Sequence, residues 1–203
     1  MDGKIKSKHF IGIFVVAALL VIGIVIACFT FREASYNPTE TVVVTIDKEE
    51  IYLDEVLYHV TLSRMQGQLY AAFMNDEDYM TRDYGDGRTM GEVMKQESMD
   101  TAIRYELLYK QALKDGYELT EDEIADSKQR AESILKTIPE EDMKSTGLTE
   151  AKIILIQQKI ALATRYYQNV YNDTSLEEEE LYEQIKEGHQ IIVQKKVWNS
   201  VEF

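Results

Sequence analysis

Residue types that carry out catalysis or hold metals are few in this chain and widely spaced. The three histidines, His9, His59 and His189, include no pair at helical spacing. The one cysteine, Cys28, excludes an intrachain disulfide and a cysteine-based zinc site. No glycine-rich phosphate loop and no serine nucleophile motif occurs. We therefore expect no catalytic residue, no metal site and no cofactor.

Two acidic segments come closest to known chemical motifs. Residues 83–87 (DYGDG) have the composition of a calcium loop. They lack its regular series of oxygen ligands and its closing glutamate, so we interpret them as a flexible turn. The four glutamates at 177–180 fall in the first turn of an expected helix, where the helix dipole favours negative charge. Both segments are interpreted as structural.

Tyrosine and methionine are the residue types that offer a binding function. The chain has 13 tyrosines and 8 methionines. Methionine repacks around varied partners, and tyrosine combines apolar area with a polar tip. Several of these side chains lie partly off the main apolar stripes of the expected helices and could line a groove for apolar polypeptide segments; the alternative is ordinary core or scattered surface. The candidates are Met65, Tyr70, Phe73, Met74, Met90, Met94, Tyr166 and Tyr171.

An uncharged apolar segment, residues 10–31, follows three lysines in the short stretch 1–9. Its 22 residues are enough to cross a bilayer, and the preceding lysines favour a cytoplasmic N-terminus. Two interpretations stay open: a retained signal-anchor helix, or a lipoprotein signal ending at Cys28, which would then be acylated. Both predict a single-pass or lipid-anchored protein of the cell membrane, with its folded part outside the cytoplasm.

The net charge of −14 limits the partners of that folded part. A domain with this much negative charge repels phosphate backbones and anionic lipid headgroups. Nucleic acid is therefore not an expected partner. The charge also keeps a protein with exposed apolar surface in solution.

The remaining chain predicts a mainly α domain at 41–203, after a polar linker at 32–40. Residues 41–46 are β-branched and predict a strand, and 51–52 a second extended piece. Capping patterns and apolar periodicity then predict five helices, with a short helical turn at 139–145 before the fourth. The tail, 190–198, again predicts a strand, and the simplest closure pairs 42–46 with 191–197. The five helices are expected at 54–74, 89–115, 120–137, 149–172 and 175–188.

Three local phrases resemble the SurA-like N-terminal domain. Residues 41–53 (TVVVTIDKEEIYL), with Ile51 and Glu55, resemble its opening strand and turn into the first helix. Residues 106–123 resemble the junction between its second and third helices, and 146–149 (TGLT) the turn into its fourth. The similarity covers about residues 41–188. These motifs are caps and helix junctions, so they carry a fold and no chemistry.

This resemblance implies a family that includes SurA-type chaperones and the PrsA-type foldases of Gram-positive bacteria. It implies an ATP-independent chaperone that binds unfolded or newly exported polypeptides. In most relatives a parvulin-type prolyl isomerase domain follows, but only 15 residues follow Gly188, so we expect no isomerase activity here. Two alternatives stay open: an isomerase whose catalytic domain lies elsewhere, and an adaptor that docks one membrane-protein partner.

Overall fold

Short β-branched segments form a small antiparallel sheet with strand order β2-β1-β3. A tight turn joins β1 (Val42–Ile46) to β2 (Glu49–Tyr52), and Asp47 adopts the left-handed conformation that this turn requires (φ 58°). The third strand, β3 (Ile191–Val193), pairs with the other edge of β1, with Ile46 opposite Ile191. The sheet therefore joins the two ends of the domain.

Helices make up most of the rest of the computed structural model, which describes residues 36–172 and 178–203. Thr89 and Thr120 each begin a helix with the predicted capping box. The threonine hydroxyl accepts a hydrogen bond from the N–H of the glutamate three residues later, and the glutamate carboxylate accepts one from the N–H of the threonine. The helices are α2 (Leu53–Met74), α3 (Met90–Lys114), α4 (Glu121–Leu135), α5 (Glu140–Thr146), α6 (Glu150–Asn172), α7 (Glu178–Glu187) and α8 (Lys195–Asn199), with a 3₁₀ turn η1 (Tyr79–Thr81).

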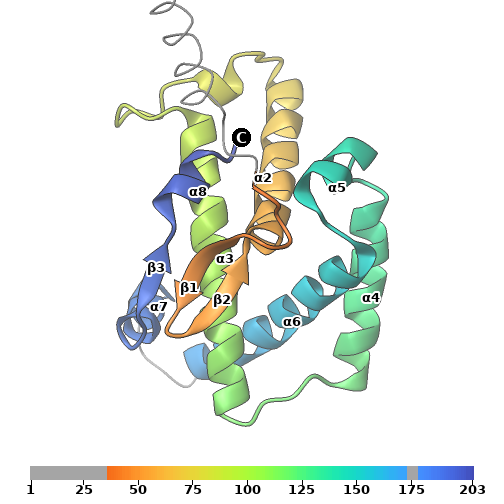
Figure 1. The fold of residues 1–203 in the computed structure, drawn as a ribbon, viewed down its shortest axis with the longest axis vertical. Helices are drawn as coiled ribbons and strands as arrows, with labels where there is room; N and C mark the ends of the chain where they lie inside the picture. The colour runs from red at the N-terminus through yellow and green to blue at the C-terminus, as the bar shows by residue number, and fades with distance from the viewer. Residues whose placement is uncertain (1–35, 173–177) are drawn as a thin grey trace, which may run out of the picture. The chain divides into compact units, whose positions relative to one another are not determined.

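Residues 36–203 pack as one unit around α3. Figure 1 shows α2 and α6 against α3, with α4 on the far side of α6 and the sheet beside α3. One apolar cluster joins the sheet, α2, α3 and the C-terminal segment. Two others fill the spaces between α2, α4 and α6, and between α3 and α6. The apolar stripes of the helices thus bury against one another.

The expected architecture and location need correction. A transmembrane helix, five helices and a pair of strands were expected; the described residues hold seven α-helices and a three-stranded sheet. No helix within 36–172 and 178–203 is long and apolar enough to cross a membrane, so nothing in these described residues supports the expected single-pass location. The segment 10–31, with Cys28, lies outside the described residues, as does Ser175, the expected cap of the fifth helix.

The C-terminal tail is also different from the expected single strand. Only Ile191–Val193 is extended; Lys195–Asn199 forms the short helix α8. The backbone N–H of Gln194 still donates to Val43 of β1, and the N–H of Trp198 then donates back to the carbonyl of Gln194. The chain therefore becomes helical after Gln194, and the side chains of Val197 and Trp198 are buried in the core. A five-residue segment with only two apolar residues, Val197 and Trp198, carries too little periodicity to separate a strand from a helix.

Candidate functional site

The last two turns of α2 present a continuous apolar surface to solvent. Leu69 is 68% exposed and Phe73 is 86% exposed, while Tyr70 and Met74 are 41% and 54% exposed. The spacing of four residues places Leu69 beside Phe73 and Tyr70 beside Met74 on the helix surface. We call these four residues the α2 patch. Four large apolar side chains on adjoining positions are more than the scattered exposure expected of any soluble protein.

The patch exists because α2 is longer than the core that covers it. Residues from Leu53 to Thr61 are mostly buried, and Gly67 is the last buried position of the helix. At Gly67 an added Cβ would lie 2.6 Å from the sulfur of Met80 and 3.2 Å from Cε of Met94, so η1 and α3 approach the helix closely there. Beyond Gly67, the face bearing Leu69 and Phe73 has no covering helix among the described residues.

The loop that follows α2 gives the patch a negative rim. Residues 75–88 contain five acidic residues and two arginines. Arg82 pairs with Asp76, and Arg88 pairs with Asp86. The side chains of the other acids, Glu77, Asp78 and Asp83, have no basic partner within the described part of the chain. The last turn of α2 also has no basic residue, so the negative end of its dipole is left without a cation.

Three of the eight predicted binding residues, Tyr70, Phe73 and Met74, belong to the α2 patch. The ring of Tyr70 also lies 6.2 Å from that of Tyr79 in η1, which links the patch to the loop. Tyr171 lies in α6, where its side chain falls outside the described residues.

The other four predicted binding residues lie away from this exposed surface. Met65 is partly buried in the cluster between α2, α4 and α6, and Met90 is partly buried at the start of α3. Met94 and Tyr166 are buried. Tyr166 donates a hydrogen bond of 2.7 Å to Asp115 and lies edge-on to the ring of Tyr117. These contacts connect α6 to the end of α3.

Leu69 is the patch residue that the sequence reasoning missed. It lies on the same apolar stripe as Tyr58 and Leu62, and an apolar stripe predicts the face of a helix that is buried. Tyr58 is indeed buried, and Leu62 and Met65 are partly buried, but the stripe continues past the core. The only signal available was the length of the stripe compared with the neighbouring helices.

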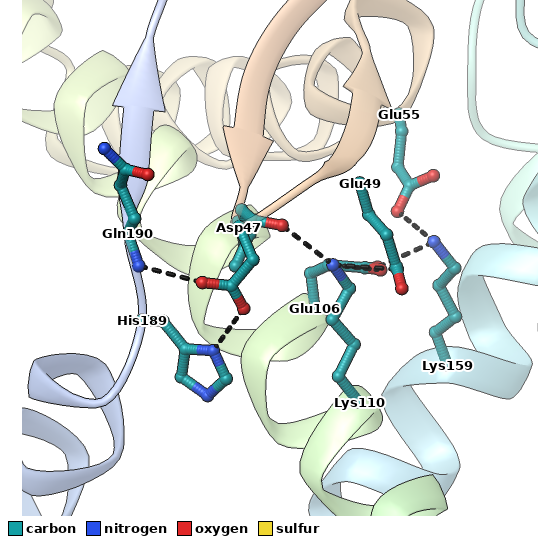
Figure 2. Close-up of polar contacts among 9 residues, drawn as sticks. Asp47, Glu49, Glu55, Glu106, Lys110, Lys159, His189 and Gln190 are labelled. Atoms are coloured by element: carbon teal, nitrogen blue, oxygen red, sulfur yellow. Dashed lines mark hydrogen bonds and ion pairs between the residues drawn. The ribbon is translucent and has the colours of Figure 1, made fainter.

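A cluster of charged residues at and beside the β1–β2 turn is the second notable site. Figure 2 shows Lys159 of α6 between two carboxylates, 2.8 Å from Glu55 of α2 and 2.7 Å from Glu106 of α3. Burial lowers the pKa of Lys159, but the charges and hydrogen bonds of both glutamates outweigh burial and raise it overall. The ammonium therefore stays charged and connects three helices.

Two further contacts in this cluster hold the sheet turn. Lys110 lies 2.8 Å from Glu49 of β2, and His189 Nδ1 lies 2.8 Å from Asp47 Oδ2. The hydrogen bond with His189, together with that from the N–H of Gln190, lowers the pKa of the Asp47 carboxyl. Each charged group of the cluster is thus engaged in holding one element to another.

The described residues contain no cluster of potential metal ligands. No group of three histidine, cysteine, aspartate or glutamate residues there could hold a metal ion. In the segment 83–87, Asp83 accepts from the N–H of Gly85, and Asp86 accepts from the N–H of Arg88. These carboxylates stabilise the turn itself.

Comparison of this chain with protein-family models, curated proteins and solved structures finds no match.

Proposed function

We propose that this protein is an ATP-independent chaperone that binds unfolded or partly folded polypeptides through the α2 patch. The observation that carries the proposal is the set of four large apolar side chains exposed together at the end of α2. Such a surface offers burial to apolar segments of another chain, at about 25 cal/mol per Å² removed from water. A methionine, a tyrosine, a leucine and a phenylalanine together can adapt to partners of different shape.

Two other features support this proposal. The net charge of −14 keeps a molecule with an exposed apolar surface dispersed, also when a client is bound. The resemblance of residues 41–188 to the SurA-like N-terminal domain points in the same direction, since that family binds unfolded chains. Neither feature requires a catalytic group or a cofactor.

The test is suppression of client aggregation by the full chain. We expect near-stoichiometric protein to lower light scattering from several unrelated clients diluted out of denaturant. Replacing Phe73 and Leu69 by serine (Phe73→Ser, Leu69→Ser) should raise the amount of protein required by at least about fivefold, because each change removes roughly 1 kcal/mol or more of apolar contact.

The matched control is Leu113→Ser with Leu155→Ser. Both leucines are about half exposed and lie on α3 and α6, outside the patch. The control should suppress aggregation as the unmodified protein does, and thermal unfolding should show that all three proteins are equally folded. If the unmodified protein protects none of the clients, the chaperone proposal is wrong. Binding of one discrete folded partner without protection of any client would favour the adaptor alternative.

A further inference from the structure

The charges around the α2 patch restrict which apolar segments it can accept. Glu77 and Asp78 lie three and four residues after Met74, the last residue of the patch, and neither has a basic partner in the described part of the chain. The backbone N–H of Asn75 satisfies the carbonyls of Ala71 and Ala72, yet no lysine, arginine or histidine lies in the last turn of α2. The negative end of the helix dipole and the unpaired carboxylates of Glu77 and Asp78 therefore both make the electrostatic potential at this edge of the patch negative.

Cations near the patch are already occupied by ion pairs. Arg82 and Arg88 pair with Asp76 and Asp86 of the same loop. Arg64, one turn before Gly67, lies 2.5 Å from Asp142 of α5. An apolar client that brings acidic residues to the rim would therefore meet uncompensated negative charge, whereas a client with lysine or arginine would supply the missing counterions.

We infer that the α2 patch selects apolar polypeptide segments flanked by basic residues. This inference rests on the proposed function and specifies its client class. A second copy of this chain is a poor occupant, because two patches facing each other would bring two acidic rims together in molecules that each carry a charge of −14.

The experiment compares three fluorescent peptides that share one apolar core of leucine and phenylalanine and differ in their flanks: lysine, serine or glutamate. Binding to the full chain is followed by anisotropy at low and at high salt. We expect the lysine-flanked peptide to bind about 5- to 10-fold more tightly than the serine-flanked one at low salt, and the difference to shrink to about twofold near 0.5 M salt because the charges are exposed and screened. The glutamate-flanked peptide should bind most weakly.

A pair of charge variants locates the effect. Glu77→Gln with Asp78→Asn should reduce the advantage of the lysine-flanked peptide to about twofold or less and leave the serine-flanked peptide unchanged. The control, Glu97→Gln with Glu132→Gln, changes the net charge equally at exposed positions of α3 and α4 and should keep the advantage. An equal loss in both variants would show that total charge, not the rim, selects the client, and would overturn the inference.

The outcomes for the unmodified protein separate the inference from the proposed function. If all three peptides bind equally, the basic preference is wrong while the client-binding surface stands. If none of them binds, the proposed function fails and the inference fails with it. Concentration-dependent dimers that dissociate on Phe73→Ser, seen by sedimentation, would instead identify a second copy as the occupant and overturn the inference.

Discussion

His59 shows how one partly buried side chain couples stability to pH. Its ring lies 5.1 Å from that of Tyr58 and is stacked on Tyr105 at 5.9 Å. Burial lowers the pKa of His59 from 6.5 to about 4. Between pH 6.5 and about pH 4, His59 binds a proton in the unfolded chain but not in the folded chain. The folded state therefore loses stability as the pH falls through this range.

We predict that His59→Phe removes this acid sensitivity, because phenylalanine keeps an aromatic ring in place and cannot bind a proton. From pH 7 to pH 4 the unmodified protein should lose on the order of 2 kcal/mol more unfolding free energy than the variant. Urea denaturation at each pH measures this difference. Parallel pH profiles for the two proteins would contradict the assignment of the low pKa to His59.

Lys159 and Tyr166 are single polar side chains that hold helices together. Lys159 forms ion pairs with both Glu55 and Glu106 and so connects three helices, and Tyr166 connects α6 to Asp115 at the end of α3. Burial and the bond to Asp115 raise the pKa of Tyr166. Both side chains stabilise helix packing, and neither is exposed as the α2 patch is.

Among the elements, helix starts are determined locally. At Thr120 the hydroxyl accepts from the N–H of Glu123 at 3.2 Å, and the Glu123 carboxylate accepts from the N–H of Thr120 at 2.8 Å. A residue and its third neighbour are enough to create this arrangement. The capping boxes of α3 and α4 could therefore be predicted from the sequence, and the structure confirms both.

We predict that Thr120→Ala lowers the unfolding free energy by about 1 kcal/mol, since the N–H of Glu123 loses its acceptor. Thr120→Ser keeps a hydroxyl oxygen at the same place and should lower the unfolding free energy by only about a few tenths of a kcal/mol. Chemical denaturation followed by circular dichroism compares the three proteins. Equal losses for alanine and serine would mean that the threonine methyl group, and not the cap, carries the effect.

At the scale of the whole molecule, the C-terminal segment completes the core. Trp198 of α8 is buried with Val43 and Met99 in the cluster that joins the sheet to α3. Lys95 of α3 lies 4.8 Å from the centre of the Trp198 ring and donates to the carbonyl of Val201. The first and last segments of the domain thus share one apolar core.

We predict that Trp198→Ala lowers the unfolding free energy by about 3–5 kcal/mol, because it empties a large buried volume. Trp198 is the only tryptophan, so unfolding should be followed by far-ultraviolet circular dichroism. The control Ile192→Ala removes a half-exposed side chain of β3 and should change stability by less than about 1 kcal/mol. A loss below 1 kcal/mol for Trp198→Ala would show that the C-terminal segment is peripheral to the fold.

The sequence by itself determined the features that depend on neighbours along the chain. The helix starts at Thr89 and Thr120 follow from capping patterns, and the strand Val42–Ile46 follows from its β-branched composition. Each of these signals acts over four or five residues, so no knowledge of the distant chain is needed to interpret it.

Tertiary structure alone decided which apolar side chains stay uncovered. Leu69 and Met65 lie on one stripe of α2, yet Met65 packs against other helices while Leu69 faces solvent. Lys195–Asn199 likewise became helical as it packed Val197 and Trp198 into the core. Burial depends on which distant segments pack against a face, and that is a property of the folded chain as a whole, which no local pattern encodes.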